Sequence, residues 1–165
     1  MDYTIKQLER YGFETFRTTM IDRHPDWQIT TTNDLESEKP SFEHYDVDVV
    51  TPEECHYEVE IKTRPEYTIT SFPDLEIDET KVNWIQDDLK KNKCDRAFLC
   101  GIYPQNEEMV IWEIKQNCNY PSKKSYRPKK TAETDKVEFV EKSMVAFPME
   151  GGKRIKIKTK DDGIE

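Results

Sequence analysis

The sequence predicts an α/β domain in which helices flank a mixed β-sheet, in the order α-β-β-β-α-β-β, with a C-terminal β extension. Apolar residues recur at helical spacing in two segments, residues 4–20 and 79–91. Residues 45–63 instead alternate between polar and apolar side chains, as strands do. Two apolar runs, residues 96–103 and 109–115, follow the second helical segment and predict two further strands.

The first helix has a clear start in the sequence. Thr4 followed by Gln7 is a capping-box pattern. Gly12 interrupts the helix at a cost of about 1 kcal/mol, which suggests that another element packs closely against it. After the helix, residues 27–32 predict the first strand, and the polar residues 33–44 predict a loop.

A hairpin with acidic residues along one side is the central predicted feature. Residues 45–50 (YDVDVV) form its first strand and residues 55–63 (CHYEVEIKT) its second. Because side chains alternate along a strand, Asp46 and Asp48 share one face of the first strand. The corresponding face of the second strand carries His56, Glu58, Glu60 and Lys62.

The second half of the chain is less regular. Residues 66–70 (EYTIT) predict a short strand, and residues 72–80 lead into the second helix, for which Asp78 is the expected N-cap. After residue 118, we expect a basic loop and then one or two strands beginning near Lys136.

Length and composition indicate one heavily charged domain. The chain has 165 residues, of which 36% are charged and 35% hydrophobic. We expect a single domain over residues 1–150, with a core (5–118), a basic loop (119–130) and C-terminal strands (131–150). Residues 151–165 are expected to form a tail that is either an edge strand or mobile.

Several protein classes are disfavoured by the composition. A formal charge of −9 argues against a simple basic protein that coats nucleic acid. No apolar run approaches the ~20 residues that cross a bilayer, and the first residues lack the apolar core of a secretory signal. The four cysteines form no C-x-x-C pair, which favours free thiols in a reducing compartment. We expect a soluble protein of the cytoplasm, or of the host cytoplasm if a phage encodes it.

The pattern of an acidic residue, any residue and a lysine is weak evidence alone, because this composition yields several matches by chance. It occurs at Glu60/Lys62, Glu79/Lys81, Asp88/Lys90 and Glu113/Lys115. Only the first pair follows, across one turn, a strand with acids on one face. Such carboxylates can converge on Mg²⁺, which takes few protein oxygens and keeps waters for a phosphate. A solvated strand face with paired Glu and Lys fits the same residues.

These segments resemble the core of the PD-(D/E)xK nuclease superfamily, which has a restriction-endonuclease-like fold, and especially its small Holliday-junction-resolvase-like proteins. The resemblance lies in YGFETF, with Gly12 and Glu14, in YDVDVV, with Asp48, and in YEVEIKTR, with Glu60 and Lys62. It covers about residues 5–118. The strongly acidic charge departs from those proteins, which tend to be basic, and puts four-way junctions in doubt as the substrate.

The resemblance implies a role for each matched residue. Asp48 and Glu60 would bind Mg²⁺ or Mn²⁺, with the Ile61 carbonyl and Glu14 as further ligands. Lys62 would position the attacking water. Lys81, which opens the second helix, falls where many members place a second basic or polar catalytic residue. Asp46 competes with Asp48 because both face the same way, although the family's spacing favours Asp48.

The basic segment suggests how nucleic acid would bind. Tyr120 and Tyr126 are interleaved with basic residues there, a pattern typical of backbone contacts and base stacking. A solvated linker is the alternative. The candidate nucleic-acid-binding residues are Lys123, Lys124, Arg127, Lys129 and Lys130.

The sequence therefore favours a metal-dependent nuclease, an endonuclease rather than an exonuclease, acting on DNA rather than RNA. No membrane partner is expected, and a homodimer would supply two sites for cutting two strands. Two alternatives stay open. One is a catalytically inactive acidic module on the same fold that binds a protein partner or mimics DNA. The other is an RNA-directed endonuclease.

Overall fold

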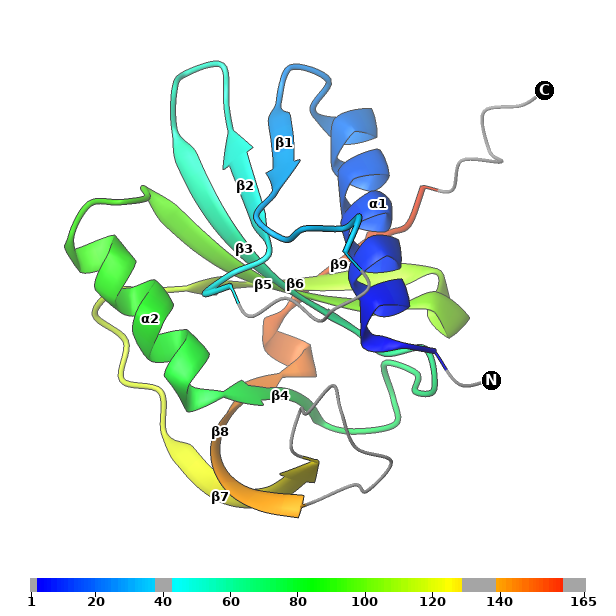
Figure 1. Ribbon diagram of the computed structural model, residues 1–165, viewed down its shortest axis with the longest axis vertical. Helices are drawn as coiled ribbons and strands as arrows, with labels where there is room; N and C mark the ends of the chain where they lie inside the picture. Colours follow the sequence, from blue (N-terminus) through cyan, green and yellow to red (C-terminus); the bar gives the residue numbers. More distant parts are fainter. Residues whose placement is uncertain (1–2, 38–42, 129–138, 159–165) are drawn as a thin grey trace.

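The computed structural model describes residues 3–37, 43–128 and 139–158, which form a mixed α/β structure with two α-helices (Figure 1). In chain order the helices and strands are α1 (Ile5–Arg23), β1 (Gln28–Thr31), β2 (Val47–Val50), β3 (His56–Thr63), β4 (Asp74–Asp78), α2 (Glu79–Lys90), β5 (Arg96–Tyr103), β6 (Glu108–Ile114), β7 (Ser122–Pro128), β8 (Phe139–Pro148) and β9 (Lys153–Lys156).

The strands form two sheets. A six-stranded mixed sheet has the order β1-β2-β3-β5-β6-β9, and a smaller sheet has the order β4-β8-β7. In the large sheet β1, β2 and β3 pair antiparallel, whereas β3 and β5 pair parallel. A parallel pair needs a long connection, and the chain makes it through β4 and α2. The small sheet curves beneath α2, away from α1 (Figure 1).

Each face of the large sheet is covered by one helix, so two apolar clusters form. On the α1 face, Phe16 packs with Val59 and Ile102. On the α2 face, Ile85 packs with Leu99. None of the described helices is long and apolar enough to cross a membrane.

The capping box and the close packing at Gly12 are both confirmed. The N–H of Gln7 donates to the Thr4 hydroxyl at 3.1 Å, and the N–H of Thr4 donates to the Gln7 side chain at 2.9 Å. A Cβ atom at Gly12 would lie 2.8 Å from the Thr63 hydroxyl oxygen and 3.0 Å from a methyl of Ile61. Glycine therefore allows α1 to approach β3 closely.

Residues 66–70 do not form the predicted strand; they lie in a turn-rich loop. The strand is instead β4, in the segment predicted to lead into α2. Its Leu75 and Ile77 are buried and alternate with more exposed acidic residues. The ladder partner of β4 is β8, far along the chain, so nearby residues could not reveal the pairing.

The predicted basic loop is also wrong over residues 122–128, which form β7 and pair antiparallel with β8. Lys129 and Lys130 lie outside the described residues. Of the two alternatives for residues 151–165, the edge strand is confirmed over Lys153–Lys156, because β9 pairs with β6. The cysteines are free thiols, as expected.

Candidate active site

Glu60 is the centre of a charged cluster on the α2 face of the large sheet. Its side chain is fully buried, with 0% exposed. The Nζ atoms of Lys62 and Lys81 each lie 3.0 Å from its Oε1. Lys81 also donates to Oε2 at 3.2 Å. Lys62 comes from the same strand, whereas Lys81 comes from the first turn of α2, which the crossover connection brings over the sheet.

Asp46 joins this cluster from the residue just before β2. Its N–H donates to the Val59 carbonyl at 3.0 Å. Its carboxylate accepts the backbone N–H of Ile61 at 2.7 Å and the side-chain amide of Asn33 at 2.9 Å. Because Asp46 is held at the level of Val59 and Ile61, its charge acts on Glu60 and Lys62.

Asp48 lies elsewhere along the hairpin. The register pairs it with Glu58 rather than with Glu60. The Tyr45 hydroxyl donates to its Oδ1 at 2.7 Å, and His56 Nε2 lies 2.6 Å from the same oxygen. The structure therefore places Asp46, not Asp48, beside Glu60 and Lys62.

The ionisation of the Glu60 cluster follows from burial and neighbouring charge. Burial raises the pKa of Glu60, an effect that the Lys62 ammonium opposes and Asp46 reinforces. Burial alone would lower the pKa of Lys62, but the carboxylates of Glu60 and Asp46 outweigh it, so the pKa of Lys62 is raised. Lys62 is therefore an ammonium donor at neutral pH and not a free base.

A second polar cluster surrounds Asp48. The Nδ1 atom of His56 lies 2.8 Å from the Lys93 carbonyl oxygen, so both ring nitrogens face acceptors. Burial alone would lower the pKa of His56. The hydrogen bonds to Asp48 and to the Lys93 carbonyl together raise this pKa by more than burial lowers it, so the net shift is upward. Beside Asp48, burial and the neighbouring Asp88 carboxyl raise the pKa of Glu58 to about 8.

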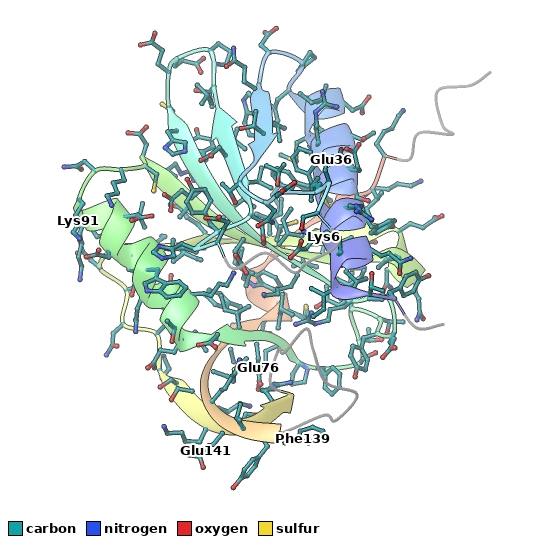
Figure 2. The ribbon with its side chains drawn as sticks, viewed as in Figure 1. Lys6, Glu36, Glu76, Lys91, Phe139 and Glu141 are labelled. Atoms are coloured by element: carbon teal, nitrogen blue, oxygen red, sulfur yellow. The ribbon has the colours of Figure 1, made fainter. Side chains whose placement is uncertain are left out.

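Glu14 and the basic candidates lie apart from Glu60. Glu14 is on α1, which packs on the opposite face of the sheet. Lys123 and Arg127 are on β7, where both pair with Glu76 of β4. Figure 2 shows Glu76 above the arch of β7 and β8. Lys124 lies between them in sequence on β7.

Sequence reasoning missed two contributors near Glu60. Asn33 comes from a loop, and nothing in its local sequence signals its contact with Asp46. Arg64 extends the row of Glu60 and Lys62, because side chains two residues apart share a strand face. Arg64 is the last residue of YEVEIKTR, and the alternation of side chains along a strand places it on the same face as Glu60 and Lys62.

The oxygen atoms around Glu60 are of the kind that a hard cation such as Mg²⁺ prefers as ligands. Asp46 and Glu60 provide carboxylate oxygens, and Ile61 provides a backbone carbonyl between Glu60 and Lys62. Oε1 of Glu60 is buried and, within the described part of the chain, accepts no hydrogen bond of ordinary geometry. Across those residues no group of three or more His, Cys, Asp or Glu side chains is arranged to hold a metal ion. Any such site would use two carboxylates, which Mg²⁺ tolerates.

Comparison with protein-family models, curated proteins and solved structures finds no match to this chain.

Proposed function

We propose that this protein is a Mg²⁺- or Mn²⁺-dependent nuclease with a restriction-endonuclease-like core, which hydrolyses phosphodiester bonds in DNA. The observation that carries the proposal is the position of Glu60. It is a fully buried carboxylate that contacts Lys62 and Lys81, and Asp46 lies close by. Buried ionisable groups gathered in this way are more typical of functional sites than of ordinary sheet faces.

The chain topology supports the same proposal. An antiparallel meander of β1, β2 and β3 is followed by α2 and by β5 parallel to β3. This order agrees with the one that the PD-(D/E)xK resemblance implies. The resemblance favours Asp48 as the aspartate, whereas here it is Asp46, just before β2, that lies opposite the second half of β3. Antiparallel strands bring the start of one beside the end of the other, which is how two distant carboxylates meet here.

Each residue of the Glu60 cluster would have its own role in the reaction. Asp46, Glu60 and the Ile61 carbonyl would hold the cation, which supplies an activated water and offsets charge on the phosphate. Lys62, as an ammonium, orients the attacking water and donates to a phosphate oxygen. Lys81 adds a second positive charge beside the same carboxylate and balances Glu60 when no ligand is bound.

A cleavage panel tests the proposal. The protein is incubated with supercoiled, linear, single-stranded and branched DNA and with RNA, in Mn²⁺ or EDTA. We expect Mn²⁺-dependent cleavage that Glu60→Gln and Lys62→Ala each reduce by at least about a hundredfold. Glu113→Gln is the matched control, because Glu113 belongs to the other strand-borne E-x-K pattern and binds Arg96 instead. Cleavage by Glu60→Gln and Lys62→Ala that equals cleavage by the unchanged protein would show that these residues do not form the active site.

A second candidate function is a non-catalytic acidic module on the same fold. The ion pairs of Glu60 favour it, because two ammonium groups already neutralise the carboxylate and make a cation unnecessary. Calorimetric titration with Mn²⁺ separates the two candidates. Saturable binding that Glu60→Gln abolishes supports the nuclease, and an absence of binding together with an absence of cleavage supports the module.

A further inference from the structure

A basic cavity of about 400 Å³ lies between the loop after β3, the strand β4 and the strand β7. Its size falls within the ~300–1,000 Å³ range of small-ligand sites. Its lining includes the cationic side chains Arg64, Lys123, Lys124 and Arg127 and the carboxylates Asp74 and Glu76. Positive charge therefore exceeds negative charge here, although the whole chain carries −9.

Arg64 connects this cavity to Glu60 and Lys62. It follows β3 directly, on the same face as those two residues, and its N–H donates to the Ile102 carbonyl at 2.8 Å. Its guanidinium is half-buried and donates to the Thr63 carbonyl at 3.4 Å. No carboxylate of the described residues pairs with it. A partly desolvated guanidinium with free N–H donors is stabilised by an anionic oxygen ligand.

The opposite wall presents further donors. One carboxylate, Glu76, holds two cations: Lys123 lies 2.5 Å from its Oε1, and Arg127 donates to its Oε2. The Nε atom of Arg127 is buried and has no hydrogen-bond partner among the described residues. Glu76 thus orders the two side chains without cancelling their charge.

Two exposed aromatic rings also line the cavity. Tyr67 is 41% exposed and Phe72 is 52% exposed. Their ring centroids are 5.0 Å apart in an edge-to-face arrangement, which leaves ring surface free. Exposed aromatic rings beside cations are the combination with which proteins bind single-stranded nucleic acid, because a base stacks on the ring while its phosphate meets the cation.

We propose that this cavity binds an unpaired nucleotide of a single-stranded nucleic acid, with its phosphate on Arg64 and its base against Tyr67 and Phe72. The inference rests on the proposed function, since it names the substrate class of that site. The Cα atoms of Lys62 and Arg64 are about 7 Å apart in extended backbone, and Arg64 follows Lys62 on the same face towards the cavity. A base inside a duplex has both faces covered by its neighbours and cannot stack here.

Fluorescence anisotropy in EDTA measures binding without cleavage. The probes are a labelled single-stranded oligonucleotide, its duplex form, a free mononucleotide and inorganic phosphate as a competitor. We expect the single strand to bind more tightly than every other probe. Arg64→Ala and Phe72→Ala should each weaken its binding about tenfold. The salt dependence should fall by about 0.7 in log–log slope for the lost Arg64 charge.

Lys91→Ala is the matched control, because it removes one positive charge at the end of α2, far from Glu76 in Figure 2. Phe72→Ala alters an exposed ring, so it keeps the test valid if Arg64→Ala fails to fold. Single-strand binding that neither variant weakens, or duplex binding as tight as single-strand binding, would overturn the inference.

The two proposals fail in different ways. Arg64-dependent binding of single strands without cleavage in Mn²⁺ would leave this inference standing and overturn the nuclease. Glu60-dependent cleavage with single-strand binding insensitive to Arg64 and Phe72 would do the reverse.

Discussion

The carboxylate of Asp46 accepts the backbone N–H of Ile61 at 2.7 Å, and this hydrogen bond holds it beside Glu60. Asp48, on the same face of the hairpin, is held by Tyr45 and His56 instead. The two aspartates therefore occupy different clusters, although the sequence presents them as equivalent.

Asp46→Asn should weaken Mn²⁺ binding and reduce cleavage more than Asp48→Asn does. Asparagine keeps an oxygen that accepts the Ile61 N–H, so the change removes charge while preserving shape. We expect at least a tenfold difference between the two variants in calorimetric Mn²⁺ affinity. A stronger effect of Asp48→Asn would show that Asp48, and not Asp46, binds the cation.

Lys81→Ala should increase the affinity for Mn²⁺ severalfold. Its ammonium lies 3.0 Å from Glu60 Oε1 and repels any cation that approaches that oxygen. Lys62 remains to balance Glu60 in the variant. The measurement is calorimetric titration, with Lys90→Ala, at the other end of α2, as the control. Weaker binding in Lys81→Ala would show that Lys81 supports the site rather than competing with the cation.

Gly12→Ala should lower the free energy of unfolding by about 1–3 kcal/mol, despite the helix propensity of alanine. The new methyl would lie 2.8 Å from the Thr63 hydroxyl oxygen, so α1 must move away from β3. Urea unfolding measures the change. Gly151→Ala is the control, because a Cβ there meets no atom within 4 Å, and a change within about 0.5 kcal/mol is expected. Equal stability of the two variants would contradict the close approach.

Glu58 should make the protein less stable as the pH rises from about 4.5 to about 8. Burial raises the pKa of Glu58 in the folded protein to about 8, whereas an exposed Glu titrates near 4.5. The contribution of Glu58 to the free energy of unfolding is highest below about pH 4.5, where Glu58 is protonated in both the folded and the unfolded state. This contribution falls as the pH rises towards 8, because the Glu58 carboxyl ionises more readily in the unfolded state than in the folded state. Glu58→Gln should flatten this decline in urea midpoints, and the exposed Glu53→Gln should not. An unchanged decline in Glu58→Gln would contradict the raised pKa.

The cysteines should react with a thiol reagent in a fixed order. Cys118 is exposed, whereas Cys94 and Cys100 are buried. Burial raises the pKa of Cys94 to about 12 and also raises that of Cys100, so neither forms a thiolate at neutral pH. We expect Cys118 to be labelled quickly in the native protein and the two buried thiols only in urea. Fast native labelling of Cys100 would contradict the packing of β5.

Both helices and the acidic hairpin could be predicted from the sequence because their signals are local. The capping box at Thr4 joins residues three apart, and the alternation along β3 joins residues two apart. The N-cap at Asp78 is likewise a contact with Thr80. Such features need no knowledge of distant segments, and all of them are confirmed.

The strand β4 could not be predicted from the sequence, because its ladder partner β8 lies far along the chain. The strand β7 pairs with β8, the next strand along the chain, but its own residues lack the apolar alternation of a strand. A charged segment such as that around Lys124 has the composition of a loop until a partner strand supplies its hydrogen bonds. The basic cavity depends on this pairing as well, since it brings Glu76 to Lys123 and Arg127.

The choice between Asp46 and Asp48 also depends on the tertiary structure and not on the local sequence. Alternation places both on one face but carries no information about the partner residue, so the sequence led to Glu60 and Lys62, while the resemblance favoured Asp48 over Asp46. The register of β2 against β3 decides it, by pairing Asp48 with Glu58 and setting Asp46 against the N–H of Ile61. Register is a property of two strands packed together, and therefore only the folded chain reveals which aspartate lies beside Glu60.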